Sequence, residues 1–137
     1  MTHNHPLRFI SCDWGTSRFR LRLVETRTLA VLAENVTDQG VAKLGRPGSG
    51  ENPDSRYGRF INYLEEQVAL LTNDYGQTHY NCIVSGMASS SIGMRELPYA
   101  ELPFGASGQE LVCKRIAARG GFDIVLVSGV QSDANVM

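Results

Sequence analysis

Six apolar side chains recur at intervals of three and four residues, and this stripe constrains the fold more than any other feature of the chain. They are Tyr57, Phe60, Ile61, Leu64, Val68 and Leu71. Such spacing places all six on one face of an α-helix, which Asp54 or Ser55 can cap. Burying that face would contribute on the order of 10 kcal/mol before entropy is subtracted. The stripe therefore predicts core packing against a second apolar layer, not a cofactor site.

Short apolar segments elsewhere in the chain provide that layer as strands. Residues 7–12 are largely apolar, and residues 18–23 alternate arginine with apolar side chains, at the period of a strand with one wet face. A third strand is expected around residues 29–34, which would complete an antiparallel meander with short connections. Residues 81–85 and 123–127 are expected to form two more strands, the second of them buried.

Two further segments complete the expected order of elements. Residues 39–53 are rich in glycine, proline and polar side chains and are expected to form a loop. Residues 105–119 fit either a helix or a strand that begins near Leu111. The order β-β-β-α-β-α-β predicts a single α/β domain with a mixed sheet over residues 1–137.

Charge and composition narrow the range of functions. The chain has 137 residues and a formal net charge of -1, which argues against binding nucleic acid or a membrane surface through bulk electrostatics. No apolar run reaches the roughly 18 residues of a membrane span. Residues 1–7 lack the apolar stretch of a secretory signal, so a cytoplasmic location is expected. Three cysteines without a Cys-x-x-Cys pair favour neither a disulfide framework nor a zinc site.

The turn between the first two expected strands carries the residues best suited to chemistry: Asp13, Trp14, Gly15, Thr16 and Ser17. A carboxylate at a strand end, here Asp13, can hold Mg²⁺ directly or through water. Gly15 lets a phosphate approach the backbone, and Thr16 and Ser17 offer hydroxyl and amide donors to its oxygens. Phosphoryl transfer requires these components, although an ordinary hairpin turn is the alternative interpretation. Neither a P-loop nor a Rossmann motif occurs in the chain.

This Asp-x-Gly-Thr-Ser turn resembles the first phosphate loop of the actin-like kinase class. A more specific run is Ser-Gly-Met-Ala-Ser-Ser-Ser-Ile-Gly-Met at residues 85–94, followed by Pro-Tyr at 98–99 and Leu-Pro at 102–103. It is similar to the Gly-Met, Ser, Gly-Trp, Pro-Tyr and Pro pattern of the 2-dehydro-3-deoxygalactonokinase family. Further segments that resemble this family are residues 39–41, 127–130 and 135–137.

Three positions depart from the family pattern. Met94 stands where the family has Trp, Ser128 where it has Pro, and Ser89 where it has Gly. These differences bear on substrate specificity and not on the class of enzyme. The resemblance covers essentially the whole chain, and the second phosphate loop and the adenosine-binding motif of such a kinase would lie outside it.

The resemblance implies the N-terminal lobe of an actin-like ATPase, which has a ribonuclease H-like fold. It also implies ATP-dependent phosphorylation of the 6-hydroxyl of 2-dehydro-3-deoxy-D-galactonate in galactonate catabolism, with ATP and Mg²⁺ as cofactors. Asp13 would then hold the metal, and Gly15, Thr16 and Ser17 would contact phosphate. Because the C-terminal lobe would be missing, we expect the chain to be truncated, inactive alone, and able to associate with that lobe or with itself.

The resemblance further implies a sugar-acid pocket within residues 86–99, formed by Gly86, Met87, Ser90, Gly93, Arg95 and Tyr99. Ser90 and Tyr99 would hydrogen-bond substrate hydroxyls, although residues 89–91 also fit a plain polar turn. Arg95 would pair with the substrate carboxylate, or it is a solvated loop charge.

The catalytic base and the activity itself both have alternatives. Asp133 is the candidate base, because it follows a buried strand and residues 132–135 resemble the Asn-Asp-Ala-Asn run of other sugar kinases. It equally fits a loop aspartate or a helix cap. The alternative functions are another sugar kinase or a polyphosphate phosphatase of the actin class, and a non-catalytic protein that binds sugar acids.

Overall fold

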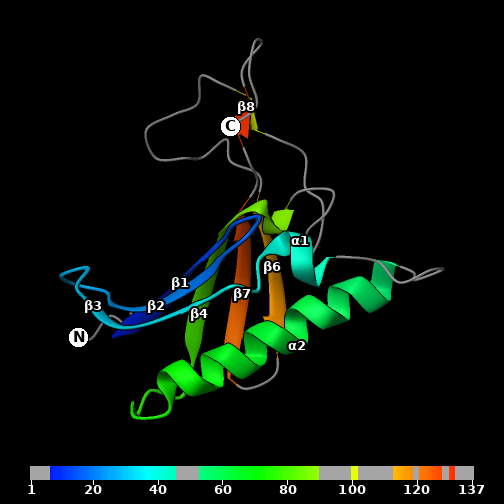
Figure 1. Cartoon of the computed structure of the whole chain (residues 1–137). Helices are drawn as coiled ribbons and strands as arrows, with labels where there is room; N and C mark the ends of the chain where they lie inside the picture. The colour runs from blue at the N-terminus through cyan, green and yellow to red at the C-terminus, as the bar shows by residue number, and fades with distance from the viewer. Residues whose placement is uncertain are drawn as a thin grey trace.

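A computed structural model describes residues 7–45, 53–89, 100–101, 113–118, 121–127 and 130–131. Within them, six strands form one sheet in the order β3-β2-β1-β4-β7-β6 (Figure 1). These strands are β1 (Arg8–Trp14), β2 (Phe19–Glu25), β3 (Val31–Thr37), β4 (Tyr80–Gly86), β6 (Cys113–Ala118) and β7 (Phe122–Val127). Two short strands, β5 (Ala100–Glu101) and β8 (Val130–Gln131), pair separately in parallel. The helices are α1 (Val41–Leu44), α2 (Pro53–Thr72) and a single 3-10 turn, η1 (Met87–Ser89).

The first three strands form the antiparallel meander that the sequence predicts, with β2 between β1 and β3. The third strand begins at Val31, later than expected. Leu29 has a φ of 62°, a left-handed conformation that a strand cannot contain. The Glu25 N–H donates to the Ala30 carbonyl across this turn at 2.9 Å. Residues 29 and 30 therefore connect the two strands instead of extending the third.

The other strands make the sheet mixed, as predicted. β1 is parallel to β4 and β4 is parallel to β7, whereas β6 is antiparallel to β7. β3 runs in the same direction as β1, because two antiparallel steps separate them. Four strands therefore end at one side of the sheet, which we call the carboxyl edge. Their last residues are Trp14, Thr37, Gly86 and Val127.

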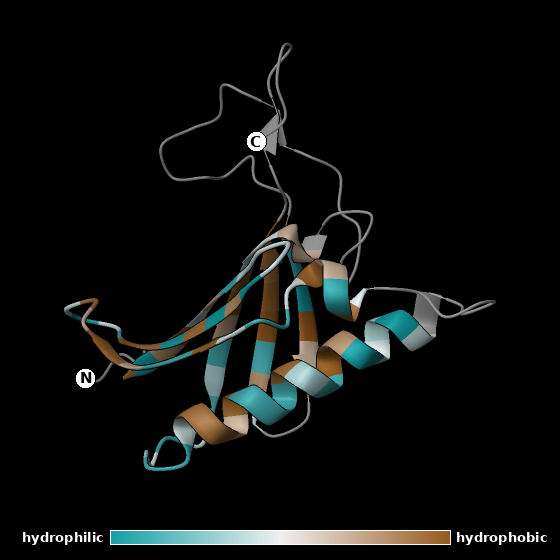
Figure 2. Cartoon of the chain, in the orientation of Figure 1, coloured by the Kyte–Doolittle hydropathy of each residue, from teal (hydrophilic) through white to brown (hydrophobic). Residues whose placement is uncertain are grey.

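Helix α2 crosses one face of the sheet and buries the predicted apolar stripe against it (Figure 1). Four stripe residues are buried and two are partly buried: Phe60, Leu64, Val68 and Leu71, then Tyr57 and Ile61. Polar and apolar residues succeed one another along α2 and along the strands (Figure 2). The inward strand residues complete the core, and they include Ile10, Cys12, Trp14, Phe19, Leu21, Cys82, Val84, Ile124 and Leu126.

Three expectations from the sequence are wrong. Helix α2 begins at Pro53, where a missing N–H costs no hydrogen bond, so Asp54 and Ser55 lie inside its first turn instead of capping it. Residues 41–44, expected to lie in a loop, form the short helix α1. For residues 105–119 the sequence left a helix or a strand open. Residues 113–118 form strand β6, so the second predicted helix is not found there.

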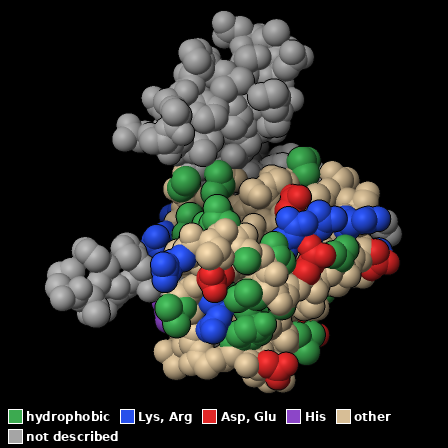
Figure 3. Space-filling model, turned by 90° about the vertical axis from the view of Figure 1, so that its left-hand side faces the viewer, with side chains coloured by type: hydrophobic (Ala, Val, Ile, Leu, Met, Phe, Trp, Pro, Cys, Tyr) green, Lys and Arg blue, Asp and Glu red, His purple; other side chains and the backbone are tan. Residues whose placement is uncertain are grey.

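The face of the sheet away from α2 carries charged and polar side chains together with exposed apolar ones, among them Val36 and Ile83. Arg22 Nε donates to Glu34 Oε2 at 2.6 Å across the β2–β3 pair, and this hydrogen bond lowers the pKa of Glu34. Arg20 Nε lies 3.9 Å from the same carboxylate oxygen. Figure 3 views the molecule from the left-hand side of Figure 1 and shows basic, acidic and apolar side chains interspersed. Among the described residues, side chains of both charge signs therefore occur on that side together with apolar ones.

Candidate active site

The carboxyl edge brings together two of the sequence segments selected above. In open α/β sheets, ligands bind outside the carboxyl ends of the parallel strands. The turn at residues 13–17 leaves β1 at this edge, and residues 86–89 leave β4 beside it. The strand register places Asp13 next to Ser85 and Trp14 next to Gly86. Two segments more than 70 residues apart in the chain therefore meet at one position.

The turn after β1 is closed by its own backbone. The Gly15 N–H donates to the Arg18 carbonyl at 2.8 Å, so this amide is already satisfied inside the turn. Thr16 and Ser17 are exposed, and neither residue's N–H or hydroxyl donates a hydrogen bond to any described residue. An added Cβ on Gly15 would meet only the Arg18 carbonyl, at 3.4 Å. No other atom of the described residues lies within 4 Å of that added Cβ, which leaves room for a ligand beside Gly15.

Asp13 is exposed at the end of β1, on the face away from α2. Its carboxylate has no hydrogen-bond or ion-pair partner among the described residues, and its cross-strand neighbour is Arg20. The buried Nε atom of Arg20 likewise lacks a hydrogen bond within the described part of the chain. Mg²⁺ keeps most of its waters and takes one or two carboxylates together with substrate phosphates. A lone, unpaired Asp13 beside an open turn fits that coordination.

Gly86 sets the distance between the two segments. Its φ is +92°, a conformation that residues with a side chain rarely adopt. A Cβ at this position would lie 2.7 Å from the Trp14 carbonyl oxygen and 3.1 Å from Asp13 Oδ1. Glycine at position 86 therefore lets the end of β4 pass directly against the Asp13 carboxylate.

A third segment, residues 39–42, also contacts the turn, and the sequence did not predict this contact. The amides of Val41 and Ala42, at the start of α1, donate to the carbonyls of Gly15 and Thr16 at 2.9 and 3.0 Å. The indole Nε1 of Trp14 donates to the Gln39 carbonyl at 3.0 Å. The only sequence signal for this segment was the resemblance of residues 39–41 to a family step, which carried no structural role.

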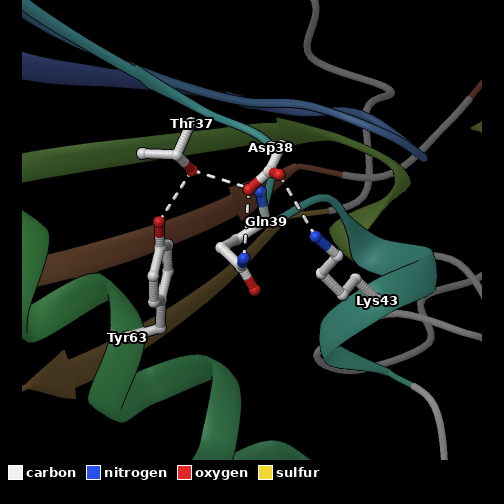
Figure 4. Close-up of polar contacts among 5 residues, drawn as sticks. All are labelled: Thr37, Asp38, Gln39, Lys43 and Tyr63. Carbon is white, nitrogen blue, oxygen red and sulfur yellow. Dashed lines mark hydrogen bonds and ion pairs between the residues drawn. The ribbon is translucent and has the colours of Figure 1, made fainter.

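Side chains tie this third segment to the rest of the molecule (Figure 4). The hydroxyls of Thr37 and Tyr63 are hydrogen-bonded at 2.7 Å, and the Gln39 N–H donates to Thr37 Oγ1 at 3.3 Å. Asp38 accepts from Lys43 Nζ at 3.2 Å and from Gln39 Nε2 at 3.1 Å. The hydrogen bond from Lys43 lowers the pKa of Asp38, which keeps this carboxylate ionised.

The remaining predicted site residues are only partly covered by the structure. Met87 begins η1 next to Gly86 and is 37% exposed. Ser90, Gly93, Arg95, Tyr99 and Asp133 lie outside the described residues, so their roles stay predictions. In the described part of the chain, no three His, Cys, Asp or Glu side chains cluster as a metal site.

The two buried cysteines do not add a nucleophile to the site. Cys12 and Cys82 have no exposed surface, and burial raises the pKa of both thiols. They remain protonated core residues at neutral pH.

No helix in the described ranges combines the length and the apolar character needed to cross a membrane.

Comparison with solved structures supports the fold. A candidate 2-dehydro-3-deoxygalactonokinase from Sinorhizobium meliloti has a similar structure, with a TM-score of 0.69 and 24% sequence identity. The match covers 94% of this chain but 38% of that protein, so the chain spans less than half of its length. An exopolyphosphatase-like protein matches at a TM-score of 0.38 and 13% identity, over 64% of this chain and 30% of its own.

Sequence comparison gives the family directly. No curated protein matches the chain. The family model described as 2-keto-3-deoxy-galactonokinase, in contrast, matches residues 13–137, beginning at Asp13 of the turn. Because this match includes most of the chain, with both segments that meet at the carboxyl edge, the chain belongs to the 2-keto-3-deoxy-galactonokinase family.

Proposed function

We propose that the chain is one lobe of a sugar-acid kinase that transfers phosphate from ATP to the 6-hydroxyl of 2-dehydro-3-deoxy-D-galactonate. The observation that carries this proposal is the position of Asp13. Its unpaired carboxylate lies between an open turn and the Gly86 segment, at the edge of the sheet where ligands bind. Membership of the family supports the reaction class and the type of substrate. The proposed location is the cytoplasm, where ATP is available.

In this proposal the turn binds the phosphates of the nucleotide. Thr16 and Ser17 are exposed, and their hydroxyls and amides donate to no described residue, so these groups can donate to phosphate oxygens. Asp13 would hold Mg²⁺, which neutralises charge on the transferring phosphate when it is bound. The fold supports an actin-like, ribonuclease H-like lobe through its meander followed by parallel strands β4 and β7.

The sugar acid would bind along residues 86–99. Gly86 starts this segment and lies beside Asp13, which supports a substrate position close to the proposed phosphate site. We propose that Ser90 and Tyr99 bind substrate hydroxyls, that Arg95 binds the carboxylate, and that Gly93 allows the backbone to turn. Asp133 would accept the proton of the attacking hydroxyl.

A second lobe would have to complete the site. The matched neighbour is much longer than this chain, and one phosphate-binding turn holds a nucleotide from one side only. In-line transfer requires ATP to be fixed on both sides and water to be excluded. We therefore propose that residues 1–137 alone are inactive, and that activity appears in the protein at its full natural length.

The test is an ADP-release assay on the full-length protein with 2-dehydro-3-deoxy-D-galactonate. Asp13→Asn should lower kcat by about a hundredfold or more, because it removes a charge that acts in a site shielded from water. Asp74→Asn is the matched control, since this exposed carboxylate lies beyond α2, at the far side of the sheet from the turn. An Asp13→Asn enzyme with near-normal kcat, or a wild-type enzyme without turnover on the sugar acid, would refute the proposal.

A further inference from the structure

We propose that Gly40 is a positioning residue for the phosphate-binding turn, and that Tyr63 anchors the segment in which it lies. This inference rests on the proposed function, because it assigns a role in nucleotide binding to residues outside the turn itself. The segment, residues 37–42, is called here the clamp. It connects β3 to α1 and lies against residues 14–18.

Position 40 has no room for a side chain. An added Cβ on Gly40 would lie 2.3 Å from the Thr16 carbonyl oxygen and 2.5 Å from the Ser17 carbonyl carbon. Both are backbone atoms, so no change of rotamer relieves the overlap. The backbone of Gly40 is itself ordinary, with φ of -74° and ψ of 176°, which any residue can adopt. Glycine is therefore required by the close approach of the turn and not by local conformation.

Both backbone hydrogen bonds between the clamp and the turn run in one direction. Val41 N and Ala42 N donate to the carbonyls of Gly15 and Thr16, so the clamp takes up the carbonyl side of the turn. In a trans peptide the N–H points away from the C=O of the same unit, so the amides of Thr16 and Ser17 point away from the clamp, where a phosphate can bind. The clamp thus orients the amides of Thr16 and Ser17, which belong to the turn and not to the clamp.

The clamp is also connected to α2 (Figure 4). Tyr63 reaches from α2 to the Thr37 hydroxyl, which accepts the Gln39 N–H. The Gln39 carbonyl in turn accepts the Trp14 indole N–H, and the Trp14 ring lies 6.1 Å from the Tyr63 ring. These contacts fix one end of the clamp to the core formed by the helix and the sheet. The turn packs against the clamp, so the core also fixes the position of the turn.

The test compares Gly40→Ala and Tyr63→Phe in the full-length protein. Gly40→Ala should raise the KM for ATP about tenfold to a hundredfold, because small displacements of positioning groups have effects of that size. Tyr63→Phe removes one hydrogen bond and should raise the KM for ATP about twofold to tenfold. The KM for the sugar acid should change less than about twofold in both variants, since the clamp orients only the phosphate side. Gly76→Ala is the matched control, because nothing lies within 4 Å of its added Cβ.

Hydrogen exchange provides a measurement that does not depend on activity. The amides of residues 41 and 42 should exchange faster in Gly40→Ala, less so in Tyr63→Phe, and at the wild-type rate in Gly76→Ala. Wild-type exchange together with a wild-type KM for ATP would overturn the inference, as would equal losses for ATP and sugar acid. If Gly40→Ala does not fold, the hydrogen exchange and the two KM values of Tyr63→Phe test the inference instead. A wild-type protein that lacks sugar-acid kinase activity refutes the proposed function alone, since the exchange rates still report on the clamp.

Discussion

Beneath α2, large side chains without exposed surface fill the space between helix and sheet, whereas at the carboxyl edge the closest contacts occur where side chains are missing. In the core, the ring centroid of Trp14 lies 5.0 Å from that of Phe60 and 4.8 Å from that of Phe19. At the edge, Gly40 and Gly86 bring backbone against backbone at separations that no Cβ would tolerate.

The difference separates stability from positioning. Burial of apolar volume contributes free energy in proportion to area and accepts many similar side chains. Close backbone contact contributes little area, but it fixes the relative position of three chain segments. Trp14 belongs to both regions, because its ring is in the core and its N–H holds the clamp. Substitutions in the core should therefore alter unfolding, and substitutions at the edge should alter the site.

The largest effect is expected in the core. Phe60→Ala removes a fully buried ring and should lower the free energy of unfolding by about 3–5 kcal/mol, measured by urea denaturation. Leu70→Ala on the same helix is the matched control, since Leu70 is 64% exposed, and it should change stability by about 0.5 kcal/mol or less. Similar losses in the two variants would mean that α2 does not pack on the sheet as described.

The core region is also the part that the sequence predicts best. The stripe on α2 and the alternation in residues 18–23 each repeat over several turns or residue pairs, so the period survives local exceptions. The start of β3 was misplaced because Leu29 adopts a positive φ, which its residue type does not indicate. The strand at residues 113–118 is ambiguous in sequence because its apolar residues do not alternate with polar ones, and the strand forms by pairing with β7.

The second prediction tests whether strain at the edge affects the site as well as stability. Gly86→Ala forces a side chain into a positive φ and against Trp14 O, so it should cost about 1–3 kcal/mol of unfolding free energy. The displaced Asp13 should also reduce kcat in the ADP-release assay.

Gly121→Ala offers a matched control for that strain. Gly121 has a φ of +80°, and its added Cβ would lie 2.6 Å from the Thr78 carbonyl, at the opposite edge of the sheet from Asp13. The two variants should lose similar stability, but Gly121→Ala should keep the wild-type kcat. If both variants lose kcat to the same extent, the effect of Gly86→Ala is general destabilisation and not displacement of Asp13.

The candidate site was only partly accessible from the sequence. The Asp13 turn and the Gly86 run could be selected because each is a short motif of suitable chemistry. The clamp could not, because Gly40 acts through contacts with Thr16 and Ser17, more than 20 residues away in the chain. A glycine in a glycine-rich segment gives no local sign of such a contact, since its own backbone angles are unremarkable for any residue.

The smallest effect should come from a glycine that makes no close contact. Gly58 lies inside α2, and nothing is within 4 Å of its added Cβ. Alanine has a better helix propensity than glycine and restricts the unfolded chain, so Gly58→Ala should raise the free energy of unfolding by about 0.4–1 kcal/mol. Urea denaturation measures this gain, and kcat and both KM values should stay at wild-type levels. A destabilised Gly58→Ala variant would show that glycine is needed in α2 for a reason other than space, and the contrast with Gly40 and Gly86 would then no longer rest on close backbone contact alone.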